Sequence, residues 1–489
     1  MKKKWLVGLM ALCMSFATVG FVGCGETPPN DDDTNTEQGG DNTGNNNQGG
    51  NTGGGTIAPT KKPSQGLDYT LSEDKTYYIV TGIGTCTDAN LVIPNTYDGL
   101  LVKEIGKDAF EYCSNLISVV IGDSVEMIGN YAFGHCYNLL SIVIGDSVQT
   151  IDMFAFQACY KLVEVVNKSP YITVEKGYNS LGYVGLYALA VYNSDSGVTE
   201  SQLTNDNGYI IYTDGEEKIL VNYIGEETDL TLPTYITQIN RFALYKCNNL
   251  TNVVIGDNVT SIGSYAVSYC LGLTSIMIPD RVETIGDYAF YACYKLVEVV
   301  NKSPYITVEK GAYYDYVGCY ALTVYNSTDT FTGTKLSNDN GYIIYTDGEE
   351  KVLVRYEGTE TDLMLPTYIT KINRNAFYFC DNLTSVVIGD NVQTIDHAAF
   401  DFCDNSTSVI IGDSVTLIDS YAFAGCSKLT DVYYKGTVSE WNDISINRKH
   451  SNDTSLINTT RYYYIEKQTD VPNDGGNYWH YVDGVPTKW

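Results

Sequence analysis

One pattern recurs every 23 residues through much of this chain, and it constrains the fold more than any other feature. The pattern reads Ala-Phe-x-x-Cys-x-x-Leu, as in Ala109, Phe110, Cys113 and Leu116. Its cysteine returns nine times, in three groups of three: Cys113, Cys136, Cys159, Cys247, Cys270, Cys293, Cys380, Cys403 and Cys426. A constant period of roughly 20 to 50 residues is typical of a solenoid, in which each repeat forms one turn of a stack.

Within one repeat, the apolar positions predict a short strand, a turn and a return segment. Val119 and Ile121 alternate as in a strand, and Gly122-Asp123 is a turn pair. From Ile128 to Cys136 the spacing is helical or 3₁₀-like, so we expect a coil of that kind to bring the chain back. One copy buries about six apolar side chains at roughly 2 kcal/mol each, whereas ordering costs about 1–2 kcal/mol per residue. Copies must therefore stack to fold.

The longer pattern Leu-x-x-Val-x-Ile-Gly-Asp-x-Val-x-x-Ile-Gly-x-x-Ala-Phe-x-x-Cys resembles the BspA-type leucine-rich repeats of bacterial surface proteins. The resemblance covers about 210 of 489 residues directly. It implies a β-rich solenoid of leucine-rich repeats in three blocks of three, with two inserts that contain β-hairpins and with terminal caps. Proteins of that family are secreted or surface-anchored, and some are adhesins for host matrix proteins or other microbes. The resemblance names no ligand.

Composition and repeat boundaries predict nine segments. They are a lipoprotein signal peptide (1–23), a disordered linker (24–63), an N-terminal cap (64–105), repeat block 1 (106–166), insert 1 (167–228), repeat block 2 (229–300), insert 2 (301–361), repeat block 3 (362–434) and a C-terminal aromatic cap (435–489).

The first residues predict export and anchoring. Lys2-Lys3-Lys4 precede an apolar stretch that ends in small residues, as in a signal peptide. Phe21-Val22-Gly23-Cys24 resembles the lipobox of bacterial lipoproteins, although Phe21 departs from the usual Leu. That resemblance implies lipidation of Cys24 and a protein held at the bacterial surface; plain secretion is the alternative. The linker that follows is rich in Gly, Asn, Thr and Asp, so it has too few apolar residues to order itself.

The two inserts are near-copies of each other. Residues 167–177 recur at 301–311, and residues 205–218 recur at 338–351. In insert 1, the strand-like segments on either side of Asp214-Gly215 predict a β-hairpin. Asp206, Asp214 and Glu216 could suggest calcium, but they lack the spacing of an EF-hand loop, and turn chemistry explains them. We therefore predict no metal and no cofactor.

The net charge of the chain narrows the classes of ligand that it can bind. Lys and Arg number 30 against 59 Asp and Glu, a formal charge of −29, so we expect no nucleic acid as a ligand because its phosphates would be repelled.

Of the 13 cysteines, nine share the one repeat position beside Phe and Leu. We interpret these nine as stacked free thiols that act as small apolar side chains. A disulfide between adjacent copies stays possible on distance but is awkward for parallel Cβ vectors.

Catalysis has little support in the sequence. The chain has only four histidines, and no Gly-x-Ser-x-Gly, His-Glu-x-x-His or phosphate-binding glycine loop. His135 adjoins Cys136, but adjacency in sequence does not orient a base toward a thiol. We therefore predict that the protein is not an enzyme and assign no catalytic residue.

A binding surface is better supported. If Val119 and Ile121 point inward, the residue between them points outward, which predicts an apolar stripe along the strand face: Val120, Val143, Val166, Val254, Met277, Val300, Val387, Ile410 and Tyr433. The stripe could also serve only to stabilise neighbouring strands. Trp441, Trp479 and Trp489 predict an aromatic cap or, alternatively, a platform for sugar rings.

These features together predict a non-catalytic surface protein that binds a protein or glycan on host or microbial surfaces. The alternatives are an envelope spacer that self-associates and a carbohydrate-binding lipoprotein.

Overall fold

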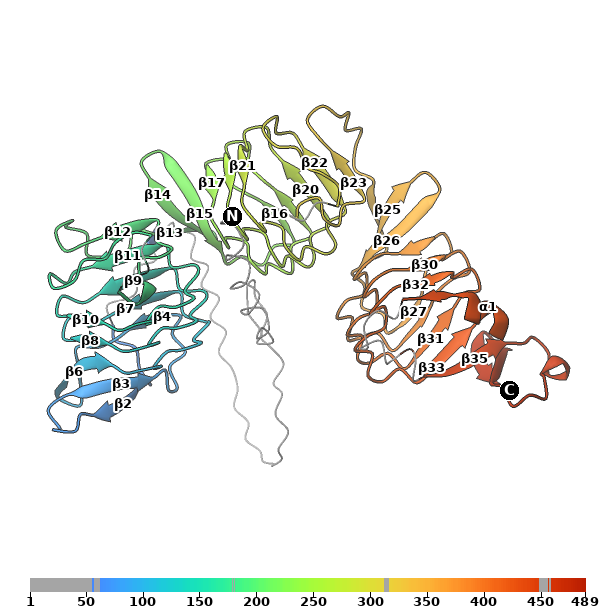
Figure 1. Ribbon diagram of the computed structural model, residues 1–489, viewed down its shortest axis with the longest axis horizontal. Coiled ribbons are helices and arrows are strands. Elements are labelled where there is room, and N and C mark those ends of the chain that lie inside the picture. The colour runs from blue at the N-terminus through green and yellow to red at the C-terminus, as the bar shows by residue number, and fades with distance from the viewer. Residues whose placement is uncertain are drawn as a thin grey trace, which may run out of the picture. The chain divides into compact units, whose positions relative to one another are not determined.

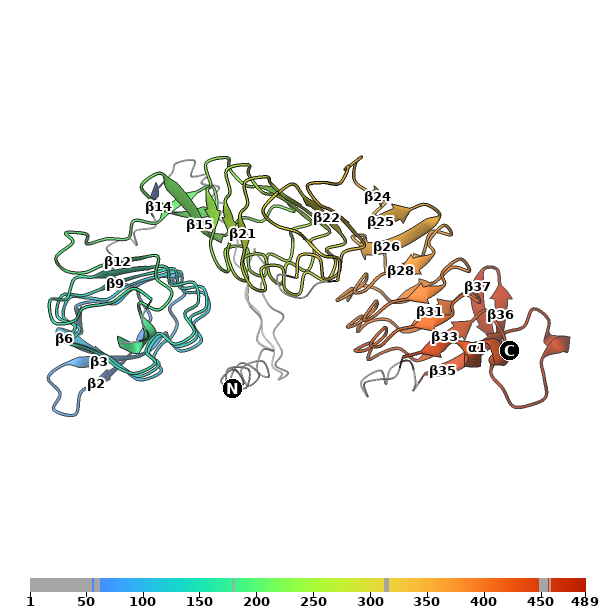
Figure 2. The same ribbon diagram turned by 45° about the horizontal axis from the view of Figure 1, so that its top comes forward.

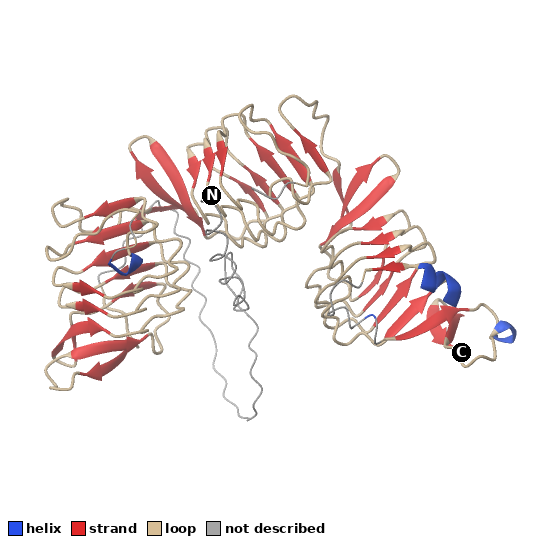
Figure 3. Ribbon diagram, viewed as in Figure 1, coloured by secondary structure: helices blue, strands red, loops and turns tan. Residues whose placement is uncertain are grey.

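The computed structural model describes residues 55–56, 62–177, 179, 181–311, 316–447, 456 and 459–489. Residues 1–23, Cys24 and most of the predicted linker lie outside this part. The chain divides into two compact units: Met1–Leu250, Ile255–Cys270 and Arg281–Tyr291 form the first, and Thr251–Val254, Leu271–Asp280 and Ala292–Trp489 form the second. In both units, short strands and turns follow each other in regular coils (Figures 1 and 3).

Each repeat contributes two strands, and they belong to different sheets. In the first unit these are β7 (Ser118–Val120) and β8 (Met127–Ile128). The next repeat contributes β9 (Ser141–Ile144) and β10 (Thr150–Ile151). Val119 of β7 lies opposite Ile142 of β9, and Ile128 of β8 lies opposite Ile151 of β10, both in parallel. The 23-residue period thus becomes two parallel ladders, which lie on different sides of the coil in Figure 2. The solenoid prediction is confirmed, whereas the shorter strand was not predicted.

Three sheets lie in the first unit. One has the order β10-β8-β6-β3-β2 with β5 paired to β6, the second β12-β11-β9-β7-β4, and the third β1-β13-β14-β15-β17-β19-β21. The remaining bounds are β1 Gly55–Thr56, β2 Asp68–Leu71, β3 Tyr78–Gly82, β4 Asn90–Val92, β5 Thr96–Tyr97, β6 Leu100–Ile105, β11 Glu164–Asn167, β12 Ala190–Tyr192, β13 Thr204–Asp206, β14 Tyr209–Asp214, β15 Glu217–Tyr223, β16 Asp229–Thr231, β17 Gln238–Ile239, β19 Ser261–Ile262 and β21 Thr284–Ile285. A 3₁₀ turn, η1, covers Leu181–Tyr183.

The second unit repeats this arrangement. β18, β20, β22 and β23 pair in parallel in that order, and two seven-stranded sheets have the orders β24-β25-β26-β28-β30-β32-β34 and β27-β29-β31-β33-β35-β36-β37. The bounds are β18 Asn252–Val254, β20 Ser275–Ile278, β22 Glu298–Asn301, β23 Thr323–Tyr325, β24 Leu336–Asp339, β25 Tyr342–Asp347, β26 Glu350–Tyr356, β27 Asp362–Met364, β28 Lys371–Ile372, β29 Ser385–Val387, β30 Thr394–Ile395, β31 Ser408–Ile411, β32 Leu417–Ile418, β33 Asp431–Tyr434, β34 Ser445–Ile446, β35 Thr460–Tyr464, β36 Tyr478–Val482 and β37 Val485–Lys488.

Two helical segments lie near the C-terminus. α1 (Val438–Asp443) begins with a capping box: Thr437 and Glu440 each accept a hydrogen bond from the other's backbone N–H. η2 covers Gln468–Asp470.

The return segment is not an α-helix, but alternate amides in it make the i→i−3 bonds of the expected 3₁₀-like spacing. After β8, residues 130–135 form turns, and the residues before Ala132 and before Cys136 have positive φ: 52° at Tyr131 and 60° at His135. A left-handed residue every fourth position prevents a helical hydrogen-bond ladder. The amides instead alternate: Ala132 N donates three residues back, to Gly129 O at 3.2 Å, whereas Phe133 N donates to Ala155 O of the next repeat at 2.8 Å.

The core lies between the two ladders. Phe110, Phe133 and Phe156 stack with centroids 5.1 and 5.2 Å apart. None of the eleven cysteines in the described part is paired in a disulfide. Those of the repeat also do more than fill space, because the thiol of Cys136 donates to the Phe110 carbonyl oxygen 3.1 Å away and that of Cys159 does the same to Phe133. Each such thiol ties its coil to the preceding one.

The predicted hairpins are present in both inserts. In the first, β14 and β15 pair antiparallel from Tyr209 opposite Tyr223 to Asp214 opposite Glu217, so the turn falls one residue later than predicted. β25 and β26 repeat the pairing in the second, from Tyr342 opposite Tyr356.

Candidate functional site

The strand face, meaning the outward side of the longer strands, is only partly open. Of the nine residues predicted to line it, Val254 is 40 % exposed and Val120, Met277 and Val387 are half-buried. The other five are buried: Val143, Val166, Val300, Ile410 and Tyr433. The expectation of a continuous exposed stripe is therefore wrong, and each block keeps open mainly its first strands.

In block 1 the cover is a segment of insert 1, Thr199–Leu203, which we call the first strap. Ser201 is buried, and its hydroxyl donates to one carboxylate oxygen of Glu164, while the amide of Gln202 donates to the other at 2.8 Å. Glu164 lies on β11 and is fully buried. Burial raises the pKa of the Glu164 carboxyl, and the hydrogen bonds from the strap oppose that rise.

Insert 2 covers block 2 with the same chemistry. In the second strap, Thr334–Leu336, the hydroxyl of Thr334 donates to Glu298 at 2.5 Å, and the amide of Lys335 donates to the other carboxylate oxygen at 2.8 Å. Glu298 lies on β22, at the position that Glu164 has on β11. Each glutamate thus accepts two hydrogen bonds from the strap that crosses its strand.

In block 3 the cover is the C-terminal hairpin of β36 and β37. Trp479 is fully buried and clusters with Ile410 and Tyr433, and its indole N–H donates to Tyr434 O at 2.9 Å. Trp441 is also buried, whereas Trp489 is 38 % exposed and stacks on His480 with centroids 3.6 Å apart. The three tryptophans therefore do not form one exposed platform.

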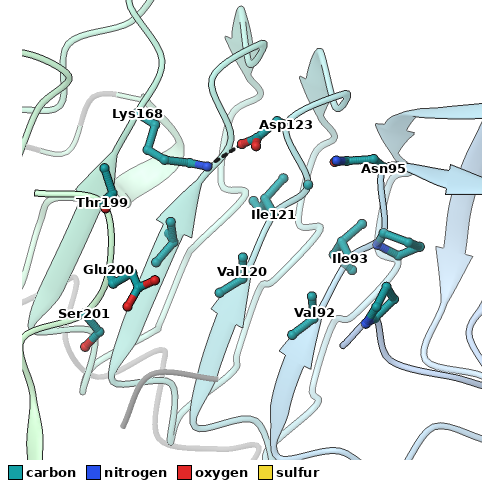
Figure 4. A pocket seen from close by; sticks show the side chains of 14 residues that line it. Val92, Ile93, Asn95, Val120, Ile121, Asp123, Lys168, Thr199, Glu200 and Ser201 are labelled. Carbon is teal, nitrogen blue, oxygen red and sulfur yellow. Dashed lines mark hydrogen bonds and ion pairs between the residues drawn. The ribbon is translucent and has the colours of Figure 1, made fainter. Parts of the chain in front are cut away.

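A pocket of about 390 Å³ remains beside the first strap. Its floor is a row of valines on adjacent strands, Val92, Val120 and Val143, and Thr199, Glu200 and Ser201 of the strap form one wall (Figure 4). The other lining residues are Pro63, Ile93, Pro94, Asn95, Ile121, Gly122, Asp123 and Lys168. The ammonium of Lys168 forms an ion pair with Asp123 at the rim.

This arrangement is suited to binding. An apolar floor with a few polar groups at its rim, at a volume of roughly 300–1,000 Å³, is the usual form of a ligand pocket. The residues weighed for catalysis do not meet there: the Cys136 thiol is fully buried against a backbone carbonyl, and burial raises its pKa well above the usual range. The imidazole of His135 stacks on Tyr112 at 4.5 Å.

The described residues contain no group of three or more His, Cys, Asp or Glu arranged to hold a metal ion. Of the acidic residues considered for calcium, Asp206 accepts a hydrogen bond from the hydroxyl of Tyr235. The same part of the chain has no helix with the length and apolar character of a membrane span.

Sequence reasoning placed Val120 and Val143 on the strand face but missed the strap and the Lys168–Asp123 pair. The one signal in the sequence was the near-identity of the two inserts. Ser201 follows Glu164 by 37 positions, and Thr334 follows Glu298 by 36.

Comparison with known proteins places the chain in a family. The family model of the BspA type leucine rich repeat region matches six copies, over residues 86–179, 222–340 and 356–464. These matches cover more than half of the chain, and the protein belongs to the BspA-type leucine-rich-repeat family. The family consists of bacterial surface proteins. No curated protein matches the chain.

Several solved structures are similar. A leucine-rich cell surface protein from Faecalibacterium prausnitzii is 20 % identical, with 80 % of this chain and 98 % of that chain covered and a TM-score of 0.25. A leucine-rich repeat protein from Bacteroides ovatus is 18 % identical, with 83 % and 100 % covered and a TM-score of 0.25. One from Eubacterium ventriosum is 19 % identical, with 76 % and 95 % covered and a TM-score of 0.29.

Proposed function

We propose that the protein is a non-catalytic recognition protein of the bacterial surface, which binds a protein or glycan of a host or another microbe. The observation that carries the proposal is the pocket beside the first strap, whose apolar floor is open at the half-buried Val120, whereas Val143 and Val166 farther along the same face are buried. Apolar surface that a fold could cover but leaves open is typical of an interaction site. We place the ligand over Val120.

The test is a binding screen of the full chain, kept in detergent, against extracellular-matrix proteins, whole cells and a glycan array. Val120→Glu puts a charge on the pocket floor at a half-buried position, so the fold should persist while binding falls at least tenfold. Met153→Glu is the matched control, because Met153 is 65 % exposed in the same unit and does not line the pocket. Val143→Glu is unsuitable because Val143 is buried.

Three outcomes separate the candidate functions. Loss of binding in Val120→Glu alone supports the proposal. Binding that persists in Val120→Glu would mean that the ligand binds outside the pocket. Loss of glycan binding in a folded Trp489→Ala variant would favour carbohydrate recognition by the C-terminal region. Absence of binding, together with concentration-dependent assembly, would favour a self-associating envelope spacer.

We also propose that Cys24 is lipidated and anchors the chain to the bacterial membrane. The support is the lipobox-like sequence Phe21-Val22-Gly23-Cys24. Mass spectrometry of the native protein should find a diacylglycerol-modified N-terminal cysteine, and Cys24→Ser should release the protein from the membrane fraction. An unmodified N-terminus beyond Cys24 would refute the anchor.

A further inference from the structure

The first strand of block 3, β27 (Asp362–Met364), carries the most exposed large apolar side chain of the described residues. Met364 is 72 % exposed. β27 lies at the edge of its sheet and pairs only with β29 among the strands described. The hairpin at the C-terminal end of this sheet covers Ile410 and Tyr433 and leaves Val387, which lies opposite Met364, half-buried.

The backbone of Met364 faces the open edge. On the paired side, Leu365 N donates to Val387 O at 3.0 Å and Thr361 O accepts from Ser385 N at 3.1 Å. Because alternate residues of a parallel strand direct their N–H and C=O groups to opposite sides, Met364 directs its own away from β29. Its carbonyl oxygen lies 3.5 Å from the hydroxyl of Tyr342, a long distance for a hydrogen bond between two oxygens.

Block 1 shows what such an edge binds. There β4 is the first strand, Ile93 N donates to Val120 O at 2.8 Å, and Val92 has the position of Met364. The amide of Ser64 donates to Val92 O at 3.0 Å, and the amide of Val92 donates to the Ser64 hydroxyl at 3.0 Å. Ser64 thus closes this edge with its amide and its hydroxyl, and Val92 is 9 % exposed, whereas Met364 is 72 % exposed.

Charge distinguishes the two edges further. Asn90 precedes Val92 by two residues, whereas Asp362 takes that position before Met364. Residues two apart on a strand lie on one face, so a carboxylate and an apolar side chain lie together on β27. Asp362 is exposed and accepts hydrogen bonds from Ser385 at 2.6 Å and Thr384 at 2.8 Å. Block 3 as a whole, residues 362–434, has nine Asp against two Lys and one Arg.

We propose that the open edge of β27 binds an extended segment of a partner protein, which pairs with the Met364 backbone as Ser64 pairs with Val92. The segment carries a basic side chain over Asp362 and an aliphatic side chain over Met364, so the two are separated by one residue. Main-chain hydrogen bonds supply affinity in this mode of recognition, and alternate side chains supply specificity. This surface belongs to the second unit and is separate from the pocket in the first.

The probe is a fluorescein-labelled octapeptide with Lys-Thr-Val at its centre, titrated with the full chain in detergent and followed by fluorescence polarisation. Three further peptides have Glu-Thr-Val, Lys-Thr-Thr-Val and Lys-Thr-Val followed by an N-methylated residue, because in parallel pairing the amide after the valine is the one that donates to Met364 O. We expect the first peptide to bind at least tenfold more tightly than each of the others, because they lose the charge, the spacing and a backbone donor respectively.

Variants locate the binding. Met364→Ser and Asp362→Asn change exposed residues and should each weaken the first peptide about tenfold, whereas Met153→Ser, at a residue 65 % exposed in the other unit, should change nothing. No binding, equal binding of all four peptides, or unchanged binding by Met364→Ser would overturn the proposal. Loss of binding in Val120→Glu but not in Met364→Ser would place the peptide in the pocket and would also overturn it, while leaving the proposed function intact.

Discussion

Left-handed backbone at non-glycine residues is the unusual local feature of this protein. The residue before each repeat cysteine has positive φ, and it is Tyr112, His135 and Ala158 in block 1. An L-residue in this conformation costs roughly 1–2 kcal/mol. The strain persists because the turn directs amides toward the next coil, as from His135 N to Gln157 O at 2.7 Å.

Glycine at such a position should therefore stabilise the protein. Ala158 has a φ of 59°, and the equivalent residue in the last repeat is Gly425 with a φ of 70°. Ala158→Gly relieves the strain but adds freedom to the unfolded chain, so we expect a net gain of about 0.5 kcal/mol. Gly425→Ala is the reverse change and should cost about 2 kcal/mol, because its Cβ would lie 2.9 Å from the Phe402 ring. In thermal melts, the Tm of Ala158→Gly should lie above that of the native chain and the Tm of Gly425→Ala below it. A Tm of Ala158→Gly below that of the native chain would contradict the strain argument.

The stability of the protein should also depend on pH through a single residue, Glu164. Burial raises its pKa in the folded state, so folding favours the protonated form. The contribution of this group to stability is complete below the unfolded-state pKa near 4.5 and declines as pH rises through the folded value. Glu164→Gln keeps an acceptor for Gln202 N and a donor toward Ser201, and it cannot ionise. The Tm of this variant relative to the native chain should rise between pH 4 and pH 7; a constant difference would show that Glu164 has an ordinary pKa.

At the scale of elements, the 23-residue pattern was enough to predict the longer strand of each repeat and the stacking of the repeats. Val119 alternates with its neighbours, so β7 and its equivalents were expected, and the hairpin of β14 and β15 followed from its turn pair. The two-residue strands have one apolar landmark each, such as Ile128, which is too little to separate a strand from a turn. Tyr131 gives no sign of left-handed backbone because tyrosine does not favour it, whereas His135 is of a residue type enriched there, a signal that the sequence argument did not use.

The straps and the pocket could not be predicted for a different reason. Ser201 is 37 residues from Glu164, in a segment without apolar periodicity, so no local pattern indicates that it crosses the strand face. The half-covered face that defines the candidate site is thus a tertiary property. Val120 and Val143, which line the pocket, were among the residues predicted for the strand face.

The C-terminal hairpin is the element whose removal should matter most to block 3. Trp479 is fully buried, so Trp479→Ala leaves a cavity and an unpaired carbonyl at Tyr434, at a cost of about 3–5 kcal/mol. Hydrogen exchange of β33 and β35 should accelerate while exchange of β7 and β9 in the other unit stays unchanged. Trp489→Ala is the matched control, since Trp489 is 38 % exposed. Unchanged protection of β33 in Trp479→Ala would mean that the hairpin is not a cap.

For the whole molecule, charge repulsion and ion pairing have opposite responses to salt, and their magnitudes decide which dominates. The formal charge is −29. Ion pairs occur along the described part, and most are half-buried, like Arg355–Glu357 with side-chain exposures of 19 % and 27 %, whereas Lys107–Asp108 is the most exposed of these with 70 % and 43 %. Each pair keeps at least one side chain partly exposed, so solvent screens it. Such pairs contribute about 0–1 kcal/mol each. Carboxylates in neighbouring coils repel one another, and burial of Asp381 together with the charge of Asp404 already raises the pKa of Asp381.

Repulsion should therefore dominate, and sodium chloride should stabilise the protein at pH 7. The Debye length falls from about 30 Å at 0.01 M to about 3 Å at 1 M, so the long-range repulsion is screened over this range. We expect Tm to rise by several degrees between 0.01 and 0.5 M, measured by circular dichroism. Near pH 4, where about half of the carboxylates are protonated, the same titration should have a much smaller effect. A Tm at pH 7 that falls with salt would mean that the ion pairs between coils, such as Lys435 with Asp390, outweigh the excess of negative charge.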